Sequence, residues 1–134
     1  MATSRVNKKA PSALVAGVLG ALLIFSTASA SCGSYTSGKA SWYCKSGVSI
    51  CHRDYPAGSM VAAACADLRA AIGPNWRGRV VTVARRVSET TIVRIKVTLV
   101  DNCASTDKLI DLYAAPFSKL APTWLGVARV KVSW

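Results

Sequence analysis

The sequence predicts an all-β domain whose strands close into a barrel. Segments 79–86 and 91–100 are rich in β-branched residues and flank Ser88-Glu89, a pattern typical of a hairpin. The second segment alternates, with one apolar face (Val93, Ile95, Val97 and Leu99) and one polar face (Arg94, Lys96 and Thr98). The strands do not alternate with helices in a parallel βαβ rhythm, which favours a barrel over a layered α/β domain.

The other elements follow in order along the chain. A first strand is expected over 39–43, followed by a loop over 44–59 with a turn at 55–58. The alanine-rich segment 61–72 is expected to hold a helix that ends at Gly73-Pro74. After the hairpin, 109–112 is expected to be a strand, 114–120 a short helix with Pro116 in its first turn, and 128–134 the closing strand.

The first thirty residues have the composition of a secretory signal. Basic residues precede the apolar run 14–25, and Ala28-Ser29-Ala30 places small residues where a signal peptidase cleaves. We therefore expect a signal over 1–30, a polar lead over 31–37, a domain over 38–134, and export. Two alternatives are an uncleaved membrane anchor, because 10–30 could just span a bilayer, and a lipoprotein lipidated at Cys32, which Ser29 disfavours.

The positive charge suggests an anionic partner. The chain has 17 basic and 6 acidic residues, and the signal holds three of the basic ones, so the remainder carries a formal charge of +8. Such a surface concentrates anionic polymers, which outside the cell means peptidoglycan, teichoic-type acids or acidic polysaccharides. A nucleic acid partner is not expected, because no groove-reading element or stacking platform is recognisable. Solubility is the alternative explanation of the charge.

Five cysteines allow two disulfides and one unpaired thiol. A small exported domain has a limited core and often depends on such bridges. The sequence leaves the pairing open, although a local bridge between Cys44 and Cys51 suits the turn that they flank. A zinc site is the alternative, and the absence of a Cys-x-x-Cys pair together with a single histidine disfavours it. We therefore expect no metal and no cofactor.

Four segments resemble the rare lipoprotein A (RlpA) family, whose barrel is shared by expansins, barwin-like proteins and some endoglucanases. They are Gly38-Lys39-Ala40-Ser41-Trp42-Tyr43, Val97-Thr98-Leu99-Val100-Asp101-Asn102-Cys103, and the segments 109–120 and 126–134. The resemblance covers about residues 38–134. It implies a six-stranded double-psi β-barrel with one or two short helices. It also implies the disulfide Cys65–Cys103, so that, together with the local bridge Cys44–Cys51, Cys32 is expected to be unpaired.

The resemblance further implies a glycan site at two aspartates. The acid–base aspartate of RlpA-type transglycosylases matches Asp101, and the critical aspartate of expansins matches Asp111. The transglycosylase histidine has no counterpart, because the matching segment reads Ala62-Ala63-Ala64-Cys65 and His52 lies too early in the chain. An aspartate needs burial or a partner to keep its proton near neutral pH. We therefore expect both aspartates to line one shallow groove that binds glycan and cleaves it poorly or not at all.

Trp42, Tyr43, Arg94 and Lys96 complete the expected glycan-binding set. Adjacent strand residues face opposite sides, so one of the two aromatic residues is expected to point outward and stack on a sugar ring. Arg94 and Lys96, if close to the aspartates, would favour their ionised forms. Each residue also has a structural explanation: Asp101-Asn102 is a common turn opening, Asp111 can cap the next helix, and aromatic side chains pack in cores.

We expect a secreted, monomeric, cell-wall-associated protein that binds peptidoglycan or another wall polysaccharide. One alternative is a lytic transglycosylase or glycosidase that acts on wall glycan through Asp101 and Asp111. Another is a secreted defence or interaction protein of the barwin type. A glycan site should present both carboxyls to an open groove, whereas an interaction protein should present a filled groove and a flat exposed patch.

Overall fold

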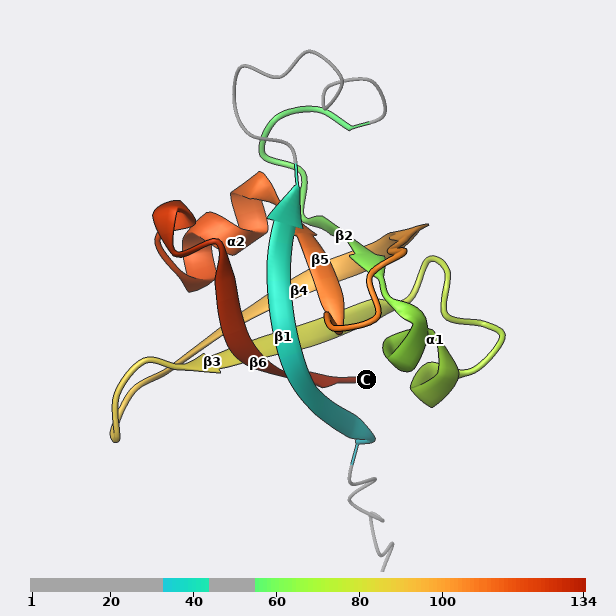
Figure 1. Cartoon of the computed structure of the whole chain (residues 1–134), viewed down its shortest axis with the longest axis horizontal. Helices are drawn as coiled ribbons and strands as arrows, with labels where there is room; N and C mark the ends of the chain where they lie inside the picture. Colours follow the sequence, from blue (N-terminus) through green and yellow to red (C-terminus); the bar gives the residue numbers. More distant parts are fainter. Residues whose placement is uncertain (1–32, 44–54) are drawn as a thin grey trace, which may run out of the picture. The chain divides into compact units, whose positions relative to one another are not determined.

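The computed structural model describes residues 33–43 and 55–134, which contain a closed barrel with short helices in its connections (Figure 1). The described strands are β1 (Tyr35–Tyr43), β2 (Val61–Ala64), β3 (Val80–Arg86), β4 (Ile92–Asn102), β5 (Ile110–Tyr113) and β6 (Val127–Ser133). The described helices are α1 (Ala66–Ile72), α2 (Ala114–Leu120) and the 3-10 helix η2 (Thr123–Leu125). None of these helices is long and apolar enough to cross a membrane. The predicted all-β barrel with two short helices is confirmed.

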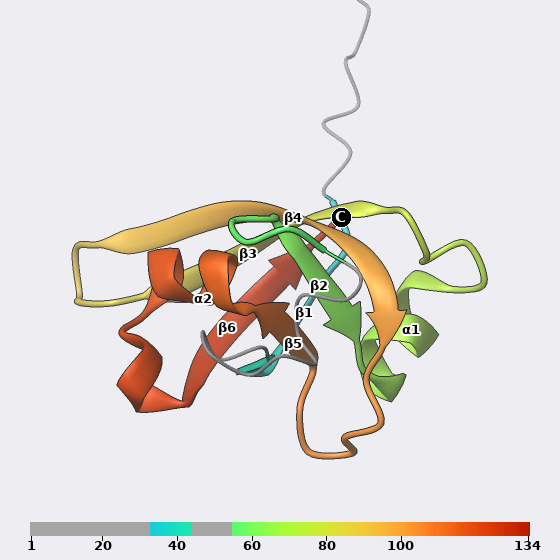
Figure 2. The ribbon, with the colours of Figure 1, turned by 90° about the horizontal axis from the view of Figure 1, so that it is seen from above.

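The strands follow one another around the barrel in the order β1-β5-β2-β4-β3-β6. β1 runs parallel to β5 and β2 parallel to β4, and the other neighbouring pairs are antiparallel. The two helices α1 and α2 lie at opposite ends of the barrel (Figures 1 and 2). Because of the strand order, β5 and β2 form one side of the barrel and β3 and β6 form the opposite side. β1 and β4 contribute to both sides.

The side chains that point into the barrel form the core, and along most of each strand they come from every second residue. In β4, Ile95, Val97 and Leu99 are buried and Val93 packs against them, which confirms the predicted apolar face. Phe117 of α2 and Leu68 of α1 are fully buried and close the barrel at its two ends. Burial of apolar side chains of this kind is the main favourable contribution to folding.

Two elements differ from their predicted extents. β1 begins at Tyr35 rather than residue 39, because β6 supplies an antiparallel partner from Tyr35, which pairs with Ser133, to Ser41, which pairs with Val127. The alanine-rich segment 61–72 is a helix only from residue 66. Its first part is strand β2, which lies between β4 and β5. The helix does end at Gly73, whose φ of 97° favours glycine.

A bulge interrupts β4 at Val100. Ala62 pairs with Leu99 but Ala63 pairs with Asp101, so Val100 is an extra residue opposite β2. If the alternation of β4 continued unbroken, Asp101 would follow Val97 and Leu99 into the core. The extra residue instead turns the side chain of Asp101 to the outer face of the barrel.

A disulfide joins Cys65, at the end of β2, to Cys103, at the end of β4. Their Cα atoms lie 4.2 Å apart, and both side chains are buried. The predicted Cys65–Cys103 pair is therefore confirmed. The other predicted bridge, Cys44–Cys51, and the thiol of Cys32 lie outside the described residues.

Candidate functional site

Four side chains lie in one row across the outer face of β1, β5, β2 and β4. Ser41 pairs with Asp111, Asp111 with Ala63, and Ala63 with Asp101. Residues paired directly across neighbouring strands point to the same side of a sheet. We call Ser41, Asp111, Ala63 and Asp101 the acidic row. It brings together the two aspartates that the sequence analysis selected.

Ala63 separates the two carboxyls of the acidic row. Neighbouring strands lie about 4.8 Å apart, so the Cα atoms of Asp101 and Asp111 are about 10 Å apart across β2. The Ala63 side chain is a single methyl group and is only 4% exposed. It packs in a buried cluster with Cys65 and Cys103, against which Tyr43 also packs, so the position between the two carboxyls is occupied by protein.

Asp111 is partly removed from water. Burial raises the pKa of its carboxyl above the ordinary value, while a hydrogen bond from Ser41 and the charge of Lys108 oppose this shift. The hydroxyl of Ser41 donates to Asp111 Oδ1 at 2.9 Å. A partly desolvated carboxyl with a positioned hydrogen-bond donor is typical of functional sites.

Tyrosine side chains border the acidic row. The hydroxyl of Tyr43 donates a long hydrogen bond of 3.4 Å to Asp101 Oδ2. The ring of Tyr43 packs edge-on against that of Tyr113, with centroids 5.5 Å apart. Tyr113 in turn donates to the backbone carbonyl of Tyr55 at 3.0 Å. Tyr43 also contacts the buried cluster of Ala63 and the disulfide, so it is fixed beside Asp101.

Trp42 points the other way from Tyr43. Its ring packs against Phe117, with centroids 6.1 Å apart, and its Nε1 donates to the carbonyl of Thr123 at 3.0 Å. With Thr123, Trp124 and Gly126 it lines a shallow hollow. Trp42 therefore faces the core and α2, and Tyr43 is the member of the pair that lies beside the aspartates.

Arg94 and Lys96 lie far from the acidic row. Both are exposed on the part of β4 that pairs with β3, whereas Asp101 lies on the part that pairs with β2. Seven residues of strand separate Arg94 from Asp101, which is about 23 Å along β4. The predicted glycan-binding residues are thus divided among separate places, and the two cations are not neighbours of the carboxyls.

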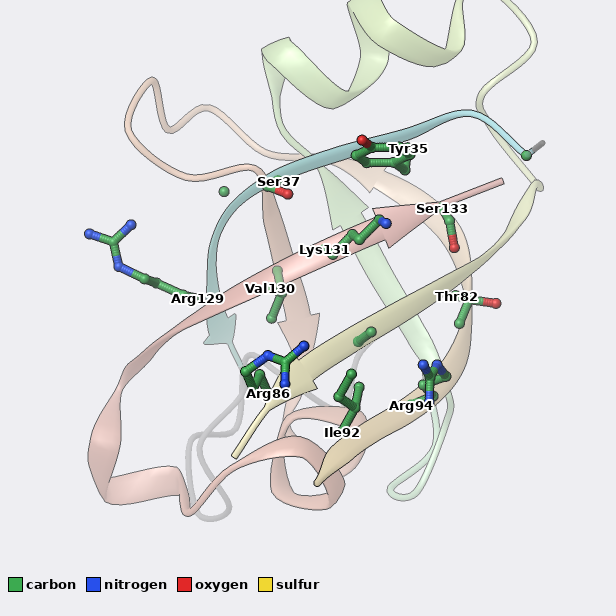
Figure 3. A pocket seen from close by; sticks show the side chains of 13 residues that line it. Tyr35, Ser37, Thr82, Arg86, Ile92, Arg94, Arg129, Val130, Lys131 and Ser133 are labelled. Atoms are coloured by element: carbon green, nitrogen blue, oxygen red, sulfur yellow. The ribbon is translucent and has the colours of Figure 1, made fainter. Parts of the chain in front are cut away.

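A second hollow, of about 710 Å³, lies on the opposite side of the barrel (Figure 3). We call it the basic groove. Its lining comes from β1, β6, β3 and β4 and includes Tyr35, Ser37, Thr82, Ala84, Arg86, Arg94, Arg129, Lys131 and Ser133. The sequence shows these basic residues on strands but does not show the register that gathers them.

Within residues 33–43 and 55–134, no three side chains of His, Cys, Asp or Glu come together in a way that could hold a metal ion. His52, the single histidine of the chain, lies outside these ranges.

The closed, mixed barrel of the described strands is an RlpA/expansin-like double-psi β-barrel, as the sequence resemblance implied. The chain is similar to the Streptomyces papain inhibitor, with a TM-score of 0.52 and 26% identity over 75% of this chain and 94% of that one. It is also similar to a mutant expansin of Clavibacter michiganensis, solved in complex with cellohexaose. The TM-score there is 0.56, with 15% identity over 75% of this chain and 50% of that one. This chain therefore spans about half the length of that expansin. No family model and no curated protein sequence match it.

Proposed function

We propose that this protein is exported to the cell wall and binds wall polysaccharide across the acidic row. The observation that carries the proposal is the register that sets Asp101 and Asp111 on one face, on either side of Ala63. Carboxylates accept hydrogen bonds from hydroxyl groups, and an aromatic ring offers an apolar surface to a sugar. Tyr43 supplies such a ring beside Asp101.

The burial of Asp111 supports the same proposal. A charge that is partly removed from water lowers the stability of the folded protein, and such costs are retained most often where a residue has a function. The bulge at Val100 has a similar implication, because bulges are frequent next to functional sites and this one turns Asp101 outward. The solved expansin that shares the fold binds a linear sugar oligomer, cellohexaose.

Cleavage of the glycan is the alternative at the same row. Hydrolases usually divide the work between a proton donor and a second carboxylate. Asp111 would be the donor, since its pKa is raised, and Asp101 the opposing carboxylate. Binding is favoured because the histidine of RlpA-type transglycosylases is replaced by alanine in the segment 62–64 of this chain.

The test compares Asp101→Asn and Asp111→Asn with the control Asp67→Asn, which removes an exposed aspartate on α1. Each protein is mixed with insoluble wall glycan, and both the pelleted protein and the soluble 1,6-anhydro sugars are measured. We expect the two row variants to lose retention, the control to keep it, and no protein to release sugars. Unchanged retention in both row variants would refute the site. Sugar release that Asp101→Asn abolishes, with folding and retention intact, would make the protein an enzyme.

Trp124 favours a second candidate function, the binding of another protein. Its side chain is 83% exposed on η2, and the apolar residues Leu125 and Val127 beside it are each 39% exposed. Tryptophan is enriched among the residues that dominate protein–protein affinity. The similar Streptomyces protein is a papain inhibitor, so papain is a suitable first partner. In this case Trp124→Ala should abolish inhibition of papain and leave glycan retention unchanged.

A further inference from the structure

The basic groove is built on rows of paired residues that run across four strands. In the central row, Ser37 of β1 pairs with Lys131 of β6, Lys131 with Ala84 of β3, and Ala84 with Arg94 of β4. The Cα atoms of Lys131 and Arg94 are therefore two strand spacings apart, about 10 Å. The methyl group of Ala84 forms the floor between them. A polysaccharide can therefore lie between the two cations without displacing a bulky side chain.

Hydroxyl groups continue the floor next to this row. Ser133 of β6 pairs with Thr82 of β3, and both line the groove. Figure 3 shows Lys131 in the middle of the lining, with Tyr35 on one side and Arg86 and Arg94 on the other. The groove thus combines cations with neutral hydrogen-bonding groups in one lining.

The cations of the groove have no acidic partners among the described residues. The one salt bridge found in that part of the chain joins Lys108 to Asp107, neither of which lines the groove. Arg86 donates to a neutral group, the backbone carbonyl of Glu89 at 2.9 Å, and keeps its charge. Like charges gathered around one hollow repel one another. An anionic ligand would remove this repulsion, and the guanidinium groups would bind its carboxylate or phosphate groups in bidentate fashion.

Tyr35 indicates which kind of polyanion fits. The ammonium nitrogen of Lys131 lies over its ring, 3.7 Å from the centroid. One face of the ring is therefore occupied by a cation, which leaves less room for the base stacking on which single-stranded nucleic acid binding depends. The floor hydroxyls of Thr82 and Ser133 instead match the hydroxyl groups of sugars.

We propose that the basic groove binds an acidic polysaccharide. Its carboxylate or phosphate groups contact Arg86, Arg94 and Lys131, and its sugar hydroxyls contact the Ser and Thr side chains of the floor. This site lies on the opposite side of the barrel from the acidic row and does not depend on the function proposed there.

The test measures binding of the purified protein to polygalacturonate, which carries carboxylates, and to phosphorylated dextran, which carries phosphates. Neutral dextran and a DNA duplex are compared at the same salt concentration. The double variant Arg94→Gln/Lys131→Gln is matched with Arg79→Gln/Lys119→Gln, which removes the same charges from exposed positions outside the groove. Two exposed charge contacts are together worth a factor of about 2 to 30 in affinity, so we expect the groove variant to lose at least about twofold relative to the control.

A third variant, Ala84→Leu, fills the floor and leaves every charge in place. We expect it to weaken binding of at least one acidic polysaccharide as much as the double variant does, with an unchanged thermal midpoint as proof of folding. The polymer that binds identifies the anionic group. Three outcomes would each overturn the proposal. They are equal losses of affinity in the groove and control variants, full binding by Ala84→Leu, and tighter binding of DNA than of both polysaccharides. The acidic-row variants test a different site. If they do not change the retention of the protein on neutral wall glycan, the proposed function fails, but the proposal for the basic groove does not.

Discussion

Removal of the Cys65–Cys103 disulfide should destabilise the protein by about 4 kcal/mol. The bridge joins residues 38 positions apart, and the loop-closure entropy that it removes from the unfolded chain gives this value. The variant Cys65→Ala/Cys103→Ala avoids leaving buried thiols. For a domain of this size, such a loss lowers the thermal midpoint by about 15–30 °C.

Urea denaturation of the oxidised wild type and the double variant measures the effect directly. The slope of the free energy of unfolding against urea should also rise in the variant, because the unfolded chain without the bridge exposes more surface. The pair Cys44→Ala/Cys51→Ala is the comparison. If those cysteines form the predicted bridge, it closes a loop with a separation of only 7 residues, and the same model gives about 2 kcal/mol. A loss below about 1 kcal/mol for the Cys65–Cys103 pair would refute the entropic reasoning.

Three further predictions follow from single side chains. Burial raises the pKa of Asp111 above 3.8, so the folded state binds its proton more tightly than the unfolded state, and stability falls as the pH rises through this range. Asp111→Asn removes that loss, and its thermal midpoint relative to wild type should be higher at pH 7 than at pH 3. A Cβ at Gly38 would lie 2.8 Å from the Cβ of buried Leu109. Gly38→Ala should therefore cost about 1–3 kcal/mol in urea denaturation, whereas Ser37→Ala should cost almost nothing. Trp124→Ser, at an 83% exposed position, should change stability by less than about 0.5 kcal/mol.

Each of these predictions has a contrary outcome. A midpoint difference between Asp111→Asn and wild type that is the same at both pH values would mean that Asp111 is not desolvated in the folded protein. Wild-type stability in Gly38→Ala would show that β1 and Leu109 separate easily. A large loss in Trp124→Ser would place that side chain in the packing of α2, and would remove the argument for a protein-binding patch.

The parts of the fold that were predictable are those whose signal is local. The helix α2 and the buried face of β4 follow from a proline in the first turn and from strict alternation, and both are confirmed. β2 was missed because alanine has the highest intrinsic helix propensity, while pairing with β4 and β5 holds Val61–Ala64 extended. The start of β1 was missed because its serine, threonine and glycine residues are ordered by β6, a strand almost a hundred residues later.

The candidate sites show the same division. Asp101 and Asp111 could be selected from motifs, but their placement on one face depends on the extra residue Val100, and a single sequence does not show a bulge. The basic groove depends on the register of β3 with β4 and β6, which sets Ala84 between Arg94 and Lys131. An effect of Arg94 and Lys96 on the aspartates was expected only for the case that they lie close, and the register separates them along β4. The hairpin with β3 was predicted, but the pairing of the second half of β4 with β2 was not.

The division of charge across the barrel has a consequence for how the molecule approaches a surface. The acidic row lies on the side formed by β5 and β2, and the basic groove on the side formed by β3 and β6. Opposite charges on opposite sides give the domain an electrostatic dipole. In the field of a negatively charged matrix, a torque turns such a dipole until its positive side faces the matrix, at distances within the screening length of about 8 Å. The acidic row then faces away from that first polymer. Under the two binding proposals, a domain with a single small core would cross-bridge two polymers of different chemistry.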